Sequence, residues 1–461
     1  MMEFMPFLLF ICICLVLIAG YPVAFSLAGT SLAFAGIGML TGTFDASFLT
    51  AVPNRIYAGI ITNTTLFAVP MFVFMGVMLE KSKIAEDLLS GMSLLFGRMR
   101  GGLGLSVILV GMLLAASTGI VGATVVTMSI LSLPTMLKAG YSPSLATGTI
   151  CATGTLGQII PPSIALVLLG DVMSTAYQQA QIDMGIFSTQ TVSVGDLFTG
   201  AIIPGLILVL LYSIYMLVVA IIKPDLAPPA RQEDIDAIKQ GNSLLGQLLK
   251  GLLPPLVLIV AVLGSILFGV ATPTEAAGVG GLGAVLLALV KKQLNLAILR
   301  DVSVSTAKVS SMVYMILIGA GIFSLVFRGF SGDILVEEIF QSLPGGATMA
   351  VIIVMLVVFL LGFILDFIEI TYMVVPIVGP ILLAMGFDPV WLGIMLAVNL
   401  QTSFLTPPFG FALFYLRGAA PDEVLTKDIY KGAVPFIAIQ VFMLVLLAIW
   451  PQLTTWLPSL L

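Results

Sequence analysis

Apolar runs about as long as a membrane is thick limit most strongly how this chain of 461 residues can fold. A helix needs about 20 apolar residues to cross the hydrocarbon core of a bilayer. Only 9% of the residues are charged, whereas soluble domains carry roughly 25%, so lipid must surround most of the chain. The pattern predicts an all-α polytopic membrane protein, with a short apolar segment at 5–19 and spans at 23–40, 62–80, 203–222, 252–270, 275–290, 306–327 and 433–450.

The residue types present exclude several functions. Histidine is absent, which excludes histidine-based acid–base catalysis, histidine-ligated metals and the Ser-His-Asp triad in this chain. The net charge of -5 has no basic run that would indicate nucleic acid. Cys12, Cys14 and Cys151 fit neither a disulfide framework nor a zinc site, and we interpret them as small buried hydrophobic residues. Residues 1–20 contain no Lys or Arg, so we expect a retained first helix rather than a secretory signal.

The distribution of lysine and arginine predicts the orientation in the membrane, because cytoplasmic loops carry an excess of both. The basic residues that we place on the cytoplasmic side are Arg98, Arg100, Lys138, Lys223, Arg231, Lys239, Lys291, Lys292 and Arg417. The loops that we place in the periplasm are 40–60, 176–197, 271–274 and 384–389, where Arg55 is the exception. Residues 223–243 form a hydrophilic cytoplasmic loop, and both termini are expected to be periplasmic.

Two segments predict re-entrant helical hairpins rather than simple spans. Residues 102–139 start and end near basic residues of the same side, with a small, polar tip at 115–124. Each arm has about 14–17 residues, or roughly 21–25 Å of helix, which is short of a core near 30 Å thick. Residues 346–383 repeat the pattern from the other side, with a tip at 362–371. Two ordinary thin spans in each segment are the alternative.

An internal repeat relates the two halves at a constant offset. Residues 134–162 align without a gap on residues 380–408, with six identities in 29 positions, chiefly proline and glycine. These residue types fix backbone geometry. Because the two hairpins enter from opposite sides, the repeat is inverted. Inverted repeats with broken helices are typical of secondary transporters, whose binding site lies near the membrane midplane.

Each repeat ends in a helix that a double proline interrupts, at 154–163 and 399–410. Proline removes a backbone donor and displaces the carbonyl four residues earlier. Carbonyls left unpaired at mid-membrane need another partner, and Na⁺ accepts backbone and hydroxyl oxygens as ligands. The two symmetric breaks therefore predict ion sites. A proline kink satisfied by neighbouring Ser or Thr side chains is the alternative for each.

The hairpin tips contain matching oxygen atoms. The first tip has the hydroxyls of Ser117, Thr118 and Thr124 among glycines. The second has two carboxylates, Asp366 and Glu369, in an otherwise apolar hairpin. An intramembrane carboxylate normally faces a polar interior and has a partner, so Asp366 is the better candidate for an ion ligand. The alternative is that both acids lie at a shallow, solvated depth.

Amphipathic segments at 84–98 and 333–343 precede the two hairpins, and we interpret them as interfacial arm helices, with surface or core helices of no special role as the alternative. The chain then divides into five parts. These are N-terminal scaffold helices at 1–60; a first inverted repeat at 61–200, with hairpin 102–139 and broken helix 142–175; linking scaffold helices at 201–304; a second inverted repeat at 305–425, with hairpin 346–383 and broken helix 390–416; and a C-terminal helix at 426–461.

Four motifs carry a resemblance to a known family: GYSPSLATG, GTLGQIIPPS, ATPTEAAGVG at 271–280 and GFDPVWLGIMLAVNLQTSFLTPPFGFAL. With these motifs the chain resembles the large membrane subunit of tripartite ATP-independent periplasmic (TRAP) transporters, the DctM-like family. The resemblance implies Na⁺-coupled uptake of a small carboxylate across the bacterial inner membrane by an elevator mechanism, and no enzymatic activity. It also implies a small four-helix membrane subunit, as a separate chain, and a periplasmic substrate-binding protein.

The resemblance also implies site residues. One Na⁺ site would use Ser117 or Thr118 with Gly157, Ile160 and Pro162, and the other would use Asp366 with Ser403, Thr406 and Pro408. The implied substrate region contains Thr124, Glu369, Thr371 and Gln401. Family members often have small Ser or Thr residues after the second-tip acid, where this chain has Phe367 and Glu369. The sequence does not identify the acid that is transported.

Three other functions compete with this interpretation. A channel is the nearest, because broken helices also line pores. An intramembrane aspartyl protease would need a second aspartate in a YD or GxGD context facing Asp366, and the sequence has none. A scaffold protein without transport activity would not need two polar hairpin tips at membrane depth.

Overall fold

The computed structural model describes residues 4–460 except 83, 97 and 230–252, and this part of the chain is helical with no strand. The helices at the predicted spans are α1 (Met5–Ile18), α2 (Val23–Thr41), α4 (Ala68–Lys81), α10 (Val194–Ile222), α13 (Leu253–Leu267), α14 (Pro273–Val290), α15 (Leu296–Gly329) and α22 (Thr426–Ile449). Seven helices of the described part are long and apolar enough to cross a membrane. The predicted polytopic all-α class is confirmed.

The first repeat begins with α5 (Ile84–Phe96) and then forms the predicted hairpin from α6 (Gly102–Thr118) and α7 (Val121–Lys138). Both ends of this hairpin meet the same short segment, because Gly101 N donates to Ala227 O (2.9 Å) and Ser142 N donates to Leu226 O (3.1 Å). The two arms therefore start and finish at one end of the molecule, which a re-entrant hairpin and a pair of thin spans have in common, and α7 is itself long and apolar enough to cross a membrane.

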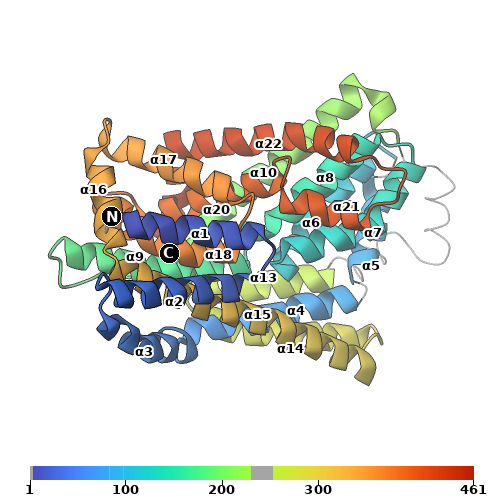
Figure 1. Cartoon of the computed structure of the whole chain (residues 1–461). Helices are drawn as coiled ribbons and strands as arrows, with labels where there is room; N and C mark the ends of the chain where they lie inside the picture. Colours follow the sequence, from blue (N-terminus) through green and yellow to red (C-terminus); the bar gives the residue numbers. More distant parts are fainter. Residues whose placement is uncertain (1–3, 83, 97, 230–252, 461) are drawn as a thin grey trace.

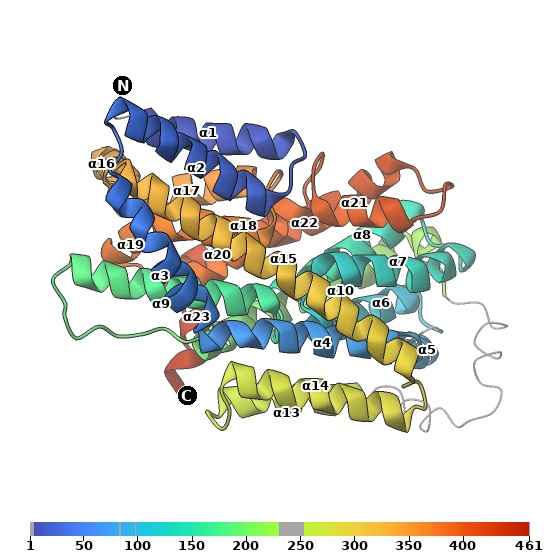
Figure 2. The same cartoon turned by 60° about the horizontal axis from the view of Figure 1, so that its bottom comes forward.

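The second repeat begins with α16 (Gly332–Ser342), followed by α17 (Gly346–Leu361), α18 (Phe367–Met373) and α19 (Val375–Ala384), with a bend of 57° between α18 and α19. Helix α19 packs on both α16 and α17, so this chain segment also turns back on itself. In Figures 1 and 2 the hairpin α6–α7 lies toward the right-hand end and α16 and α17 toward the left, where Figure 2 also shows α19. The two hairpins enter from opposite ends, as the inverted repeat predicts.

Matched glycines and prolines set the turns after the two hairpins. Gly140 and Gly386 follow α7 and α19 with φ values of +91° and +96°, a conformation that ends helices and that L residues rarely adopt. Pro143 and Pro389 then occupy the first turn of α8 (Pro143–Thr155) and α20 (Pro389–Leu405), where their missing N–H group has no helical partner to lose. The repeat residues thus specify the same helix–turn–helix geometry twice.

The centre of the molecule is formed by the two interrupted helices. Helix α8 is followed by η5 (Leu156–Gln158), a break and α9 (Ile164–Asp183), whereas α20 is followed by a break and α21 (Phe411–Ala419). All residues of α20 and nearly all of α8 are buried, so protein rather than lipid surrounds both helices. Each break contains a double proline with a cis peptide bond inside it. Both predicted broken helices are therefore present.

Some predicted details are wrong. Residues 176–183 are the last two turns of α9 and residues 194–197 begin α10, so the predicted loop shrinks to 184–193, where the Gln181 side chain bonds the backbone of Gln190 in both directions. The predicted loop 40–60 contains η2 (Ala46–Ala51), α3 (Val52–Ile56) and the start of η3 (Tyr57–Ile61). These helical segments contain polar or mixed residues, so a prediction based on long apolar runs did not find them.

Other predictions fall partly outside the described residues or agree with the structure only in part. Arg231, Lys239 and most of the 223–243 loop lie outside the described residues. The predicted domain boundaries at 200 and 304 fall inside the continuous helices α10 and α15. All three cysteines are free, and Cys151 is buried, but Cys12 and Cys14 are half-exposed on α1. The N- and C-terminal ends both lie toward the left of Figures 1 and 2.

Candidate ion and substrate site

The tip of the first hairpin is buried against the broken helix of its own repeat. Ser117 and Thr118 are only 5% and 6% exposed. A Cβ atom added at Gly119 would lie 3.0 Å from Ile164 N, the first residue of α9 after the double proline. One added at Gly157 would lie 3.4 Å from Ala115 O of α6. The structure therefore brings the predicted hydroxyls of the tip close to the predicted carbonyls of the break.

Hydroxyl groups at this tip are held by local bonds. Ser117 and Thr118 both donate to Leu114 O, at 2.9 and 3.0 Å. The Thr118 and Thr124 hydroxyls are 2.7 Å apart, which ties the two arms of the hairpin together. Thr124 also donates to Ile120 O at 3.0 Å. Each hydroxyl oxygen keeps lone pairs with which it could ligate a cation.

Carbonyl groups in the first break are only partly satisfied. Ser163 donates to Gly157 O at 2.8 Å and to Gln158 O at 3.1 Å, so a neighbouring serine does satisfy part of the kink. Within the described residues, the carbonyls of Ile160 and Pro162 accept no hydrogen bond. The buried Gln158 Oε1 atom likewise has no partner there. Neutral hydroxyl and carbonyl oxygens with free lone pairs are the kind of ligand that a hard cation such as Na⁺ accepts.

Two acids at the second tip form a capping box. The Asp366 carboxylate accepts from Phe367 N at 2.7 Å and from the backbone of Glu369, and Glu369 Oε2 accepts from Asp366 N at 2.9 Å. These bonds satisfy the first free N–H groups of α18. Glu369 is 6% exposed and Asp366 is half-buried, so neither is a solvated surface acid in this chain. A carboxylate accepting two such bonds still has lone pairs for a cation.

The other predicted residues of the second site lie on α20 and its break. Ser403 donates to Phe359 O of α17 at 2.8 Å, and a Cβ atom at Gly362 would lie 2.4 Å from Ser403 Oγ. Ser403 therefore touches the start of the second tip. Thr406 donates to Thr402 O at 2.7 Å, and Pro408 O accepts from the Tyr430 hydroxyl at 3.1 Å. No hydrogen bond joins Asp366 to Ser403, Thr406 or Pro408 among the described residues.

Two residues at equivalent repeat positions meet at the centre. Gln401 Nε2 donates to Thr155 Oγ1 at 3.3 Å, and the two residues are separated by the repeat offset of 246. Equivalent residues can touch only near the axis that relates the two repeats. Gln440 of α22 also donates to Thr155 (3.3 Å) and to the Tyr212 hydroxyl (2.8 Å). The predicted substrate residue Gln401 is thus part of a buried structural network, and its Oε1 atom has no partner among the described residues.

A cavity of about 390 Å³, with a mainly apolar wall and a few charged and polar groups, was not predicted from the sequence. It lies between α3, η3 and α15 on one side and α9, α18 and α19 on the other, and Tyr372, which follows the predicted Thr371, lines it. Asp171 also lines it and accepts from Asn63 Nδ2 (2.7 Å) and the Tyr372 hydroxyl (3.4 Å). The sequence signal that could have found it was Asp171, an acid within the apolar first half of α9, beyond the first double proline.

Comparison with known proteins agrees with this architecture. Residues 10–453 match the family model described as the DctM component of the tripartite ATP-independent periplasmic transporter. The chain belongs to the DctM family. A C4-dicarboxylate TRAP transporter large permease protein of Vibrio cholerae is 30% identical, with 98% of this chain and 97% of that protein covered. The predicted resemblance is confirmed, and this DctM-family chain is a transporter permease of the bacterial inner membrane rather than an enzyme.

Relatives of this DctM-family permease have varied substrates in their names. The sialic acid TRAP transporter large permease protein of Vibrio cholerae is 28% identical, with 96% of each chain covered. The ectoine TRAP transporter large permease protein of Halomonas elongata is 27% identical, also with 96% of each covered. Among solved structures, the Alcanivorax borkumensis YdaH transporter has a TM-score of 0.61 and 16% identity, covering 96% of this chain and 98% of that one. That likeness shows the fold alone.

Proposed function

We propose that this permease takes up a small organic acid together with Na⁺, by an elevator movement of the two hairpins and broken helices against the remaining helices. The observation that carries the proposal is the central pair of interrupted helices, of which the first is touched by the hydroxyl tip of its own hairpin and the second by the start of its acidic hairpin tip. Bound Na⁺ would supply positive charge that attracts a carboxylate. Ser117 or Thr118, together with Gly157, Ile160 and Pro162, would hold one ion. Asp366, Ser403, Thr406 and Pro408 would hold the other.

Uptake measured against Na⁺ tests this proposal most directly. The complete transporter in liposomes should accumulate the acid only when Na⁺ is higher outside than inside. Replacing external Na⁺ with K⁺ at equal ionic strength should abolish uptake. Saturation with substrate would separate a transporter from a channel, whereas single-channel currents would support the channel. Uptake that is indifferent to the cation would contradict the ion sites.

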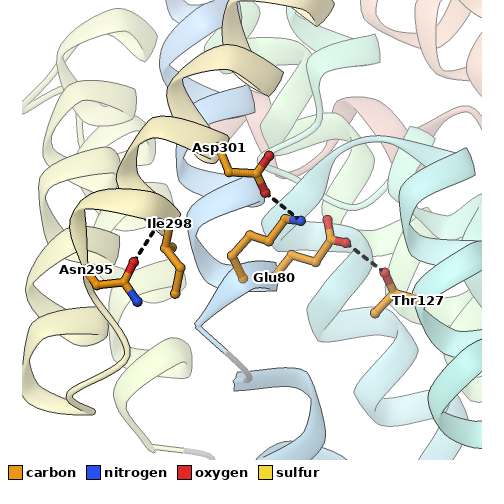
Figure 3. A network of polar contacts seen from close by, with 6 residues as sticks. Glu80, Thr127, Asn295, Ile298 and Asp301 are labelled. Atoms are coloured by element: carbon orange, nitrogen blue, oxygen red, sulfur yellow. Dashed lines mark hydrogen bonds and ion pairs between the residues drawn. The ribbon is translucent and has the colours of Figure 1, made fainter.

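Two polar contacts between helix pairs provide a test of the elevator movement. Figure 3 shows Glu80 of α4 beside Thr127 of α7, where the Thr127 hydroxyl donates to the Glu80 carboxylate at 3.2 Å. Lys81, the next residue of α4, forms an ion pair of 2.8 Å with Asp301 of α15. In the proposal α4 and α15 are both static, and α7 moves. Only the Glu80–Thr127 contact must then break during transport.

Cross-linking of cysteine pairs distinguishes these contacts. The pair Glu80→Cys with Thr127→Cys, joined by a bifunctional thiol reagent, should reduce uptake to background, because it fastens the moving hairpin to the scaffold. The matched pair Lys81→Cys with Asp301→Cys should retain most of its uptake after the same treatment, because α4 and α15 are both static in the proposal. Loss of the ion pair itself should matter little, because Lys81 and Asp301 are exposed and such pairs contribute only about 0–1 kcal/mol. Full activity of the cross-linked Glu80–Thr127 pair would contradict the elevator movement.

Partner subunits complete the proposal. The longest described loops are far too small to capture a substrate, so we propose a periplasmic binding protein for capture and a small four-helix subunit that extends the scaffold. Gly29 and Ala33 of α2 are exposed, and nothing lies within 4 Å of a Cβ atom at Gly29, which favours close helix packing there. The chain alone in liposomes should show little uptake, and both partners together should restore it. Strong uptake by the chain alone would overturn the tripartite requirement.

A further inference from the structure

The cavity between α3, α15, α9 and α18 contains two arginines without a carboxylate partner. Arg55 of α3 and Arg328 of α15 both line it and are half-buried. The closest bond of Arg55 is a hydrogen bond from Nη1 to Ser324 Oγ at 3.4 Å. In the described part of the chain, neither arginine forms an ion pair. Burial and the nearby charge of Arg328 lower the pKa of Arg55.

Two like charges in one partly buried space repel each other and lose hydration, and Asp171, the acid that lines the same cavity, forms no ion pair with either arginine. A bound anion between the two arginines would therefore stabilise the arrangement. Guanidinium groups bind carboxylates through paired N–H donors in a fixed geometry. The rest of the wall is mainly apolar, with Val172, Leu317 and Pro376 among its residues. A volume of about 390 Å³ lies within the range of small-molecule sites. These features fit a small organic acid.

Asp171 limits which acid fits. Its carboxylate lines the same cavity and already accepts hydrogen bonds from Asn63 and Tyr372. A carboxylate has about four acceptor positions, so Asp171 can accept further hydroxyl groups from a ligand. A second carboxylate on the ligand would instead be repelled by Asp171. The cavity therefore favours a carboxylate whose remaining polar groups are hydroxyls.

We propose that this cavity is a binding site for a small hydroxycarboxylate, held through its carboxylate by Arg55 and Arg328 and through a hydroxyl by Asp171. The proposal rests on the proposed function in one respect, namely that the substrate is a small acid. The cavity is separate from the two ion sites, because no predicted ion ligand lines it. Its arginines come from α3 and α15, whereas Asp171 and Tyr372 come from α9 and α18. The site would therefore be complete only when the two sets of helices are arranged as here.

Thermal unfolding of the purified full chain tests the proposal without uptake or partners. The measurement uses Na⁺-free buffer and three probes: gluconate, succinate and the neutral polyol sorbitol. Gluconate should raise the unfolding midpoint in a saturable manner, succinate should do so less, and sorbitol should match buffer alone at the same low concentrations. Neutral lipid nanodiscs with and without phosphatidylglycerol distinguish a free acid from a lipid headgroup, because the lipid would itself raise the midpoint and remove the gluconate effect.

Variants assign the effect to the cavity. Arg55→Gln and Arg328→Gln should each weaken the apparent affinity for gluconate about tenfold or more, because each removes a charged, paired contact. Arg300→Gln, on the same helix as Arg328 but exposed and outside the cavity, is the matched control and should bind as the unaltered chain does. Asp171→Asn should reduce the preference for gluconate over succinate.

The possible results separate this site from the proposed transport. The site would be overturned if neither gluconate nor succinate shifted the unfolding midpoint, or if both arginine variants showed the same gluconate shift as the unaltered chain. It would also be overturned if only phosphatidylglycerol raised the midpoint. A gluconate shift that depends on the arginines would support it even if uptake proved independent of Na⁺. Conversely, Na⁺-driven uptake by a transporter whose cavity binds none of these probes would leave the transport proposal intact and remove this one.

Discussion

The two repeats have one backbone plan and different chemistry at their hairpin tips. Helices α7 and α18 begin 246 residues apart, at Val121 and Phe367, so their N-caps Ile120 and Asp366 are equivalent positions. Ile120 has no side-chain acceptor, so no N-cap side chain bonds the first N–H groups of α7, whereas Asp366 caps α18 and forms a reciprocal bond with Glu369. The first tip thus offers neutral oxygens and a positive helix end, and the second offers a negative charge.

The double prolines differ in the same way. Ser163 satisfies carbonyls in the first break, and the equivalent position in the second is Phe409, which has no hydroxyl. There, the distant Tyr430 hydroxyl bonds Pro408 O instead. The two breaks therefore have the same backbone geometry but different polar side chains. Proline and glycine specify the break, and the polar residues around it are set separately in each half.

The opposite orientation of the two halves should give the largest effect, because a cysteine on one side of the membrane is labelled almost only from that side. Single cysteines replacing Arg98 and Lys138 should react with an impermeant thiol reagent only from the cytoplasm. A cysteine replacing Asp388, close to the equivalent turn of the second half, should react only from the periplasm. Background labelling of the native cysteines is measured in the unaltered chain. Reaction of Arg98→Cys and Lys138→Cys from opposite faces would refute the hairpin orientation.

Charge at the second tip should matter more to Na⁺ than the neutral first tip does. Asn is as good an N-cap as Asp, so Asp366→Asn removes the charge and keeps the helix cap. We expect the Na⁺ concentration for half-maximal uptake to rise about tenfold, or roughly 1.4 kcal/mol. Asp388→Asn, at an exposed helix N-cap away from the tips, is the control. A wild-type Na⁺ dependence in Asp366→Asn would remove Asp366 from the ligands.

The hydrogen bonds to the carbonyl groups of the two breaks can be compared through the free energy of unfolding. Ser163 is fully buried and satisfies two carbonyls, so Ser163→Ala should destabilise the chain by about 1–3 kcal/mol. Tyr430→Phe removes one bond near the surface and should change stability by about 1 kcal/mol or less. Unfolding midpoints of both variants in one detergent give the comparison. A larger effect of Tyr430→Phe would contradict the stronger role of the first-break serine.

Neutral oxygens at the first tip should produce the smallest change. Thr118→Val keeps the side-chain shape and removes one candidate ligand, so half-maximal Na⁺ should rise about threefold, since neutral hydrogen-bonding groups contribute about half as much as charged ones. Thr135→Val is the matched control, because Thr135 is an exposed residue of α7 whose hydroxyl only bonds Leu131 O. An equal change in Thr135→Val would show that the effect is not specific to the tip.

The sequence alone determined the class, the spans, the hairpins and the broken helices of this chain. Long apolar runs force helices because backbone groups in lipid must be satisfied within the segment. Gly140, Gly386 and the two double prolines act on their own turns, so their effects could be predicted without knowing the neighbours. The candidate oxygens at Ser117, Thr118 and Asp366 were found for the same reason: polar residues are rare in such segments.

Only the tertiary structure decided which of these groups meet. Three features depend on it: the capping box of Asp366 and Glu369, the Thr155–Gln401 contact between the repeats, and the cavity lined by Arg55, Arg328 and Asp171. The first is formed at a turn, and the other two join residues that are far apart in the sequence. Arg55 was an exception to the charge pattern, and its place in one cavity with Arg328 depends on how α3 packs on α15. Helix packing sets such contacts, and the period of the apolar runs that predicts a helix does not specify which polar residues of two helices will face each other.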